Sequence, residues 1–167
     1  MKLVSYRSIS NEDILSFKKE CLAHHMIIHG SNNLASYSDI STWKKMLSHL
    51  EKANYQQRVQ SFQYFLVDEN KEVLGIADIK PKLNKQLEKD GGHISYSTRP
   101  KYQKQGYGKT SLNLLLAEAK RLGLSEVLLT CHQDNEGSKA IILYYGGQLK
   151  NTIILNRQII NHYIINL

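Results

Sequence analysis

The chain has 167 residues, of which 41% are hydrophobic and 22% charged, and 22 Lys and Arg against 15 Asp and Glu give a formal charge of +7. This composition is typical of a globular protein with one core, and it excludes wholesale disorder. The longest apolar runs are too short to span a bilayer, and two cysteines cannot build a disulfide framework. The basic balance favours an anionic partner, whether a nucleic acid, an anionic membrane or a phosphorylated small molecule.

The N-terminal half of the sequence predicts two helices followed by a hairpin. Ser10 and Asp13 have the spacing of a capping box, which marks the start of the first helix after a short opening strand. The segment HGSNN at 29–33 predicts a loop between the helices. The expected elements are a strand at 3–7, an imperfect helix as far as residue 26, a helix at 38–52, and hairpin strands at 62–67 and 73–79.

The second half has a more regular hydrophobic pattern. Leucines and an alanine recur at helical spacing between 109 and 122, and Gly123 stands where the residue after a helix belongs. The polar segment 81–92 predicts a loop. The other expected elements are a strand at 93–98, a buried strand at 126–131, a helix at 136–145, and strands at 148–155 and 157–166.

The segment RPKYQKQGYGKT at 99–110 carries the strongest chemical signal. A strand ends there, and Gly106 and Gly108 stand at the head of a strong helix. Such a helix start presents unpaired backbone N–H groups and the positive end of the helix dipole, which suits a phosphate or pyrophosphate. An ordinary glycine-containing helix start is the alternative, because the spacing completes neither a Walker loop nor a dinucleotide fingerprint. Nearby positive charges come from Lys101, Lys104 and Lys109.

The hexapeptide 103–108 reads Q-x-x-G-x-G and resembles the acetyl-CoA signature, R/Q-x-x-G-x-G/A, of the GNAT N-acetyltransferase superfamily. Downstream, Asn135 and Ser138 resemble the family's Asn-x-x-Ala/Ser. Order and spacing match from about residue 62 to residue 145, and the first sixty residues match loosely. The resemblance implies a single α+β domain over residues 1–167. Its mixed, mostly antiparallel sheet would have about seven strands, splayed between strands 4 and 5 by a bulge in strand 4 and flanked by about four helices.

The resemblance also implies that acetyl-CoA lies between those two strands. Main-chain groups of Tyr96, Ser97 and Thr98 would bind the pantetheine arm, and Asn135 and Ser138 would contact the far side of the cofactor. The loop before the strong helix would hold the pyrophosphate with main-chain N–H groups. The residues implied for it are Gln103, Lys104, Gln105, Gly106, Tyr107, Gly108, Lys109 and Thr110.

The implied reaction is direct attack of an amine on the thioester of acetyl-CoA. His93 stands near the start of strand 4, where many relatives carry a glutamate, and is the predicted general base. Its ordinary pKa of about 6.5 suits proton collection near neutral pH. A histidine that is hydrogen-bonded within the sheet is the alternative. His132, which follows strand 5, is a second candidate for the base.

The general acid departs from the family pattern. Relatives often place a tyrosine seven residues after the Asn that corresponds to Asn135, where this chain has Ile142. Tyr145 lies one helical turn further on and is the predicted general acid; the alternatives are core packing of Tyr145 and proton delivery by water or the acceptor. His25 and His29 have a spacing that suits a metal, but no third ligand is evident, so no metal site is expected.

These patterns predict a cytoplasmic, acetyl-CoA-dependent N-acetyltransferase that acts on an amine of a small molecule or peptide. The alternative is a non-catalytic coenzyme A-binding or regulatory module of the same fold, which the isoleucine at 142 motivates. A nucleic-acid partner is not expected, because the sequence has no helix-turn-helix signature and no concentrated basic stripe. Polar residues follow Val4, so neither a signal peptide nor a membrane partner is expected. The chain is expected to be a monomer or a homodimer.

Overall fold

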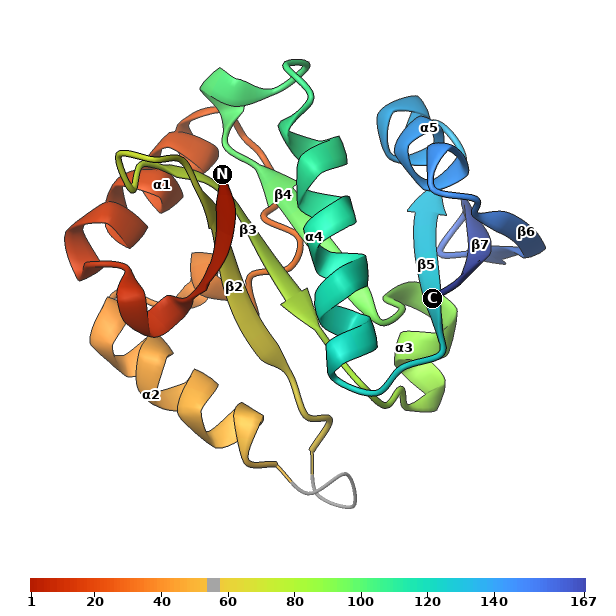
Figure 1. Ribbon diagram of the computed structural model, residues 1–167, viewed down its shortest axis with the longest axis horizontal. Helices are drawn as coiled ribbons and strands as arrows, with labels where there is room; N and C mark the ends of the chain where they lie inside the picture. Colours follow the sequence, from red (N-terminus) through yellow and green to blue (C-terminus); the bar gives the residue numbers. More distant parts are fainter. Residues whose placement is uncertain (54–57) are drawn as a thin grey trace.

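Figure 1 shows the computed structural model, which describes residues 1–53 and 58–167. The helices are α1 (Asn11–Ala23), α2 (Ile40–Glu51), α3 (Lys85–Asp90), α4 (Tyr107–Arg121) and α5 (Glu136–Tyr144), with short 3-10 helices at Tyr6–Ser8, Leu34–Ser36 and Pro100–Tyr102. The strands are β1 (Lys2–Ser5), β2 (Phe62–Val67), β3 (Val73–Ile79), β4 (Ile94–Thr98), β5 (Glu126–His132), β6 (Gln148–Leu155) and β7 (Gln158–Asn166).

The strands form two antiparallel sheets, one in the order β1-β2-β3-β4 and one in the order β5-β7-β6. Within the described residues, a single bridge between Gly92 and Leu129 joins the sheets. The predicted α+β fold with its break between β4 and β5 is confirmed. The bulge expected in β4 is wrong, because the β3–β4 register runs without a shift from Gly75 opposite Thr98 to Ile79 opposite Ile94.

The first sheet is covered on both faces. On one face, α1 and α2 pack around aromatic side chains, and the Phe65 ring meets Phe17 and Trp43 edge-on at centroid distances of 6.2 and 6.3 Å. On the other face, α4 buries Leu112 and Leu115 against the same sheet. Figure 1 shows α4 on the opposite side of β2, β3 and β4 from α1 and α2. Residues of β4 that alternate along the strand therefore point to two different environments.

The segment predicted as a loop at 81–92 contains the helix α3, so that prediction is wrong. The helix starts because the Asn84 side chain accepts a hydrogen bond from the Leu87 N–H at 2.9 Å. No residue of α3 is buried, so no apolar stripe marks it in the sequence. With α3, the described residues hold five α-helices where about four were expected.

Local signals at the ends of the other helices are confirmed. Ser10 accepts a hydrogen bond from the Asp13 N–H at 3.0 Å, which is the N-cap half of the predicted capping box. The Asp13 carboxylate bonds the Ser10 hydroxyl at 2.7 Å instead of the Ser10 N–H. The opening strand is shorter than predicted, because the chain turns into a 3-10 helix at Tyr6. Gly123 follows α4 with a φ of +90°, a conformation that favours glycine.

Both cysteines are packed inside the protein. Cys21 and Cys131 are free and buried, as small hydrophobic residues are. Among the helices of the described residues, none has the length and apolar character that crossing a membrane requires.

Candidate functional site

The head of α4 presents a row of unsatisfied backbone donors. The helix begins two residues before its predicted start, and Gly106 precedes it in a left-handed conformation with a φ of +87° and no side-chain cap. In the described residues, the N–H groups of 104–109 donate no hydrogen bond to the chain, and the first helical bond runs from the Thr110 N–H to the Gly106 carbonyl at 3.1 Å. Six free amides at the positive end of a helix dipole suit phosphate oxygens.

The side chains of two glutamines in this loop form hydrogen bonds with neighbouring main-chain carbonyls. Gln103 donates to the Thr98 carbonyl at 3.4 Å and contacts the Met26 sulfur at 3.1 Å. Gln105 donates to the Lys101 carbonyl at 2.9 Å. Both side-chain amides therefore bond the loop itself, and the donors of the Q-x-x-G-x-G segment that stay without a partner in the described residues are its main-chain N–H groups.

A buried ion pair attaches the loop to α1. Arg99 donates to the Glu20 carboxylate at 2.6 Å and to the Ser16 hydroxyl at 3.1 Å, and the Lys101 N–H donates to the other Glu20 oxygen at 3.1 Å. Burial acts to raise the pKa of Glu20, but the hydrogen bonds from Arg99 and Lys101 outweigh it and leave the pKa below its usual value. The carboxylate thus stays charged and fixes the end of β4 relative to α1.

Most of the positive charge expected around the loop is already paired. Lys101 forms an ion pair with Glu72 at 2.6 Å, and the Lys109 ammonium lies 3.1 Å from the centre of the Tyr144 ring. Lys104 is exposed and has no ion pair in the described part of the chain. The anion-binding character of the loop therefore rests on main-chain amides, with Lys104 as the free cation beside them.

Gly108 lies where the first turn of α4 meets both β4 and α5. A Cβ atom at this position would lie 3.2 Å from the Ile141 side chain, 3.4 Å from the Thr98 hydroxyl and 3.7 Å from the Tyr96 ring. The free amides are therefore next to the end of β4 that borders the break between the sheets. A larger residue at 108 would fill the space between them.

The edges of β4 and β5 that border the break carry unpaired main-chain groups. The Arg99 N–H donates to the Leu74 carbonyl, and this bond shows which main-chain groups of β4 are directed at β3. In the same way, the bond from the Gln133 N–H to the Ile159 carbonyl shows which main-chain groups of β5 are directed at β7. Main-chain groups alternate along a strand. Those directed into the break belong to Ile94, Tyr96 and Thr98 on β4 and to Thr130 and His132 on β5. Among them, the Thr98 carbonyl accepts a hydrogen bond from the Gln103 side chain and the His132 carbonyl accepts one from the Asn135 N–H at 3.0 Å. The main chain of Ser97 faces β3 instead.

His93 ties the two strands together at the end where both begin, beside α3 (Figure 1). Its N–H donates to the Leu128 carbonyl, and its Nδ1 accepts from the Leu128 N–H, both at 2.8 Å. Neutral histidine with an accepting Nδ1 carries its proton on Nε2. Burial lowers the pKa of His93, although the negative charge of Glu126 acts to raise it. Its role as a base stays a prediction, and the one lone pair of the neutral ring already has a partner.

Asn135 and Ser138 lie at the start of α5, across from the head of α4. The Asn135 side chain accepts a hydrogen bond from the Ser138 N–H at 3.0 Å, so the Asn-x-x-Ser pattern is the helix cap. The Tyr96 hydroxyl is buried near Ser138 and has no hydrogen-bond partner in the described residues. Burial raises the pKa of Tyr96 to about 12, although Ser138 acts to lower it. Ser138 thus lies close to the Tyr96 hydroxyl, at a geometry that falls short of a good hydrogen bond.

Tyr145 follows the last residue of α5, and its hydroxyl donates to the Lys109 carbonyl at 3.1 Å. Ile142, at the position where relatives carry tyrosine, is 1% exposed and belongs to the core. The structure therefore brings Tyr145 to the first turn of α4. Its role as a general acid stays a prediction, because its proton is directed at a main-chain carbonyl.

The remaining histidines do not form a metal site. No group of three metal-binding side chains occurs among the residues that the structure describes. His24 and His25 are exposed at the end of α1. Desolvation lowers the pKa of His29, and the nearby charge of His132 acts in the same direction.

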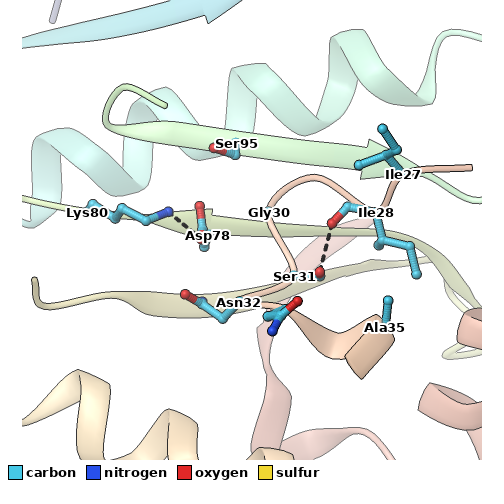
Figure 2. A pocket seen from close by; sticks show the side chains of 10 residues that line it. Ile27, Ile28, Gly30, Ser31, Asn32, Ala35, Asp78, Lys80 and Ser95 are labelled. Carbon is cyan, nitrogen blue, oxygen red and sulfur yellow. Dashed lines mark hydrogen bonds and ion pairs between the residues drawn. The ribbon is translucent and has the colours of Figure 1, made fainter. Parts of the chain in front are cut away.

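Sequence reasoning missed a polar pocket on the α1 and α2 side of the sheet (Figure 2). Asp78 is 2% exposed, and one of its oxygens lies 2.5 Å from the Lys80 ammonium. Its Oδ1 has no partner in the described residues. A single acidic residue inside the apolar strand VLGIADI was the available signal, since a buried charge is costly unless it is paired or used.

The sequence model of the acetyltransferase (GNAT) family matches residues 33–144, more than half of the chain. No curated protein matches. The fold is similar to a dodecameric spermidine N-acetyltransferase from Vibrio cholerae, with a TM-score of 0.68 and 13% identity over 99% of this chain and 92% of the other. It is also similar to a ribosomal-protein-S5-alanine acetyltransferase from Vibrio fischeri (TM-score 0.69, 16% identity, 98% and 91% covered). A ribosomal L7/L12 alpha-N-protein acetyltransferase in complex with coenzyme A is similar as well (TM-score 0.68, 16% identity, 99% and 93% covered).

Proposed function

The chain belongs to the acetyltransferase (GNAT) family, and from this premise we propose that it is an N-acetyltransferase that moves an acetyl group from acetyl-CoA directly to an amine. The observation that carries the proposal is the row of six free N–H groups at 104–109, next to two strand edges that lack partners. A diphosphate needs such donors. An extended pantetheine arm can hydrogen-bond a free strand edge.

The residues present fit acetyl-CoA because the loop offers six free amides, more than the four that every helix start leaves unpaired. The Tyr96 hydroxyl, which is buried close to Ser138, lies on the same side of the sheet. We assign the diphosphate to the amides of 104–109 and the arm to the main-chain groups of Tyr96 and Thr98. Ser138 and Asn135 border this site from α5.

Acetyl-CoA supplies the acetyl group as a thioester. A free main-chain N–H on β4 is suited to donate to the carbonyl oxygen as negative charge develops there. The amine loses one proton when its bond to the acetyl carbon forms, and the sulfur gains one when its bond to that carbon breaks, so no net acid or base is consumed. His93 and Tyr145 are the side chains proposed for this proton route. Transfer through water or the acceptor is the alternative, because both side chains have main-chain partners.

A charge reversal at the helix head tests the proposal. Gly108→Glu adds bulk and negative charge beside the free amides, and we expect calorimetric titration to show no acetyl-CoA binding. Asn113→Glu is the matched control, because Asn113 is exposed on the same helix and the charge change is identical. Equal affinity of both variants and the wild type for acetyl-CoA would place the ligand elsewhere. Wild-type binding without thiol release on any amine would favour the non-catalytic module.

The free edge of β6 supports a homodimer as the solution state. β6 is the outer strand of its sheet, and Leu149 and Ile154 on it are 57% and 77% exposed. An apolar, unpaired strand edge can pair with the same edge of a second copy about a two-fold axis. Light scattering during size-exclusion chromatography should give twice the chain mass, and Ile154→Lys should return it to that of one chain. A wild-type monomer would overturn this assignment.

A further inference from the structure

The pocket beside Asp78 lies on the side of the sheet that the proposed acetyl-CoA site leaves free. It has a volume of about 470 Å³, within the range of small-molecule sites. Strands β3 and β4 form its floor, through Asp78 and Ser95, which are opposite one another in the register. The loop between α1 and α2 forms its wall and crosses β4 so closely that a Cβ atom on Gly30 would lie 2.2 Å from the Ser95 carbonyl.

The pocket is next to the point where acetyl transfer would take place. Ser95 lies two residues after His93, which closes the break between β4 and β5, and one residue before Tyr96, whose main-chain groups are directed into the break. A thioester bound along this edge of β4 and an amine bound beside Asp78 would lie on the two sides of β4 and would meet past the point where Gly30 crosses the Ser95–Tyr96 main chain. The opposite face of the sheet is covered by α4.

The polar end of the pocket offers one charge of each sign. The Oδ1 atom of Asp78 has no hydrogen-bond partner in the described residues, although the side chain is almost wholly buried. The Lys80 ammonium, which has three donors, donates one hydrogen bond to the other oxygen of Asp78 and makes no further bond within the described residues. A buried carboxylate oxygen calls for a donor, and the ammonium retains capacity for an anionic oxygen.

The rest of the pocket is neutral. Residues 24–38, which include the whole loop wall, contain no Asp, Glu, Lys or Arg. Figure 2 shows Asp78 and Lys80 at one end of the pocket and Ile27, Ile28 and Ala35 at the other. Ile27 is 75% exposed at the rim. The pocket offers a polyamine a single carboxylate, Asp78, and Lys80 already bonds one of its two oxygens. It therefore does not suit a polyamine.

We propose that the acceptor is a free amino acid with an apolar side chain, whose amino group bonds Asp78 Oδ1 and whose carboxylate pairs with Lys80. The inference rests on the proposed acetyl transfer and names the substrate class of the same site. The apolar side chain lies toward Ile27 and Ile28. A peptide N-terminus offers the amine without the adjacent carboxylate, and a phosphorylated amine offers an anion too large and too highly charged for one ammonium.

The test compares leucine with 3-methylbutylamine, which is leucine without its carboxylate. Thiol release from acetyl-CoA should show a kcat/KM at least about tenfold higher for leucine, as expected when one charged hydrogen bond is lost. Lys80→Gln should remove this preference by lowering kcat/KM for leucine more than for 3-methylbutylamine, and part of the fall is shared by both because Lys80 also bonds Asp78. Lys82→Gln is the matched control, because Lys82 is exposed and outside the pocket. Asp78→Asn should lower kcat/KM for both amines and leave acetyl-CoA affinity unchanged.

The possible failures are distinguishable. If acetyl-CoA does not bind, the proposed function fails and this inference fails with it. If the enzyme acetylates 3-methylbutylamine, spermidine or a leucyl peptide as well as or better than leucine, the acceptor inference alone is overturned. A leucine preference that survives Lys80→Gln would also overturn it. Should Asp78→Asn fail to fold, the wild-type preference and the lysine variants still decide the question.

Discussion

His93 offers the sharpest test of how β4 and β5 are held together. In His93→Ala, the Leu128 N–H loses its acceptor at a position where Leu128 is only 9% exposed. A buried N–H without a partner costs about 1–3 kcal/mol. For a domain of this size, each kcal/mol shifts the melting midpoint by about 2–4 °C. We therefore expect the alanine variant to melt about 2–12 °C below the wild type, which scanning calorimetry measures directly.

His93→Asn is the matched variant. The Asn side-chain oxygen stands close to the position of Nδ1 and can accept the same Leu128 N–H, but it takes up no proton near neutral pH. If His93 acts by joining the strands, the asparagine variant should melt close to the wild type and release thiol at a similar rate. If His93→Asn melts like the wild type but releases thiol more slowly, at the rate of His93→Ala, the imidazole ring itself moves protons. That result would refute the structural interpretation and establish His93 as the base.

Three further outcomes follow from contacts of the site. The pKa of His93 lies below its unfolded value of about 6.5, so the unfolded chain binds more protons and the melting midpoint should fall as the pH drops below about 6.5, less so in His93→Asn. Glu20→Ala removes the hydrogen-bonded carboxylate of Arg99 and leaves Glu72 at 4.0 Å as its acidic partner, so it should cost about 1–3 kcal/mol in urea unfolding. It should also weaken acetyl-CoA binding by titration; no change in either would contradict the anchoring role. Tyr145→Phe removes the bond to Lys109 and the proposed proton donor, so we expect a loss of about 1 kcal/mol of stability and a fall of about tenfold or more in kcat at constant KM. An unchanged kcat would remove Tyr145 from the proton route.

Elements with a long hydrophobic repeat were predictable from the sequence, and elements without one were not. The apolar stripe of α4 includes Leu112 and Leu115, which are fully buried, so its period reports the packing of the helix. The helix α3 at Lys85–Asp90 buries nothing, and its single cap at Asn84 gave too weak a signal in a polar segment. The break between β4 and β5 is a property of pairing between distant segments. Its prediction depended on family resemblance rather than on any local pattern.

The candidate site divides in the same way. The loop at 103–108, which we propose binds the diphosphate, is one contiguous segment, so its glycines and the helix after it could be recognised together. The ion pairs beside this loop were not predictable, because their partners come from distant parts of the chain. Lys101 pairs with Glu72 of the β2–β3 hairpin, and Arg99 pairs with Glu20, which lies on a helix 79 positions earlier. The pocket at Asp78 requires the β3–β4 register and the crossing of Gly30 over β4.

Strand alternation links the two halves of the proposed chemistry. Neighbouring residues of β4 point to opposite faces, so Tyr96 lies among the helices α4 and α5, whereas Ser95 lies under the loop between α1 and α2. A strand that is paired on both edges would separate these two environments completely. Because the edge of β4 that faces β5 is unpaired beyond His93, a thioester held from one side is accessible to an amine held from the other. The closed end at His93 and the anchored end at Arg99 then keep the strand in place while both ligands bind along it.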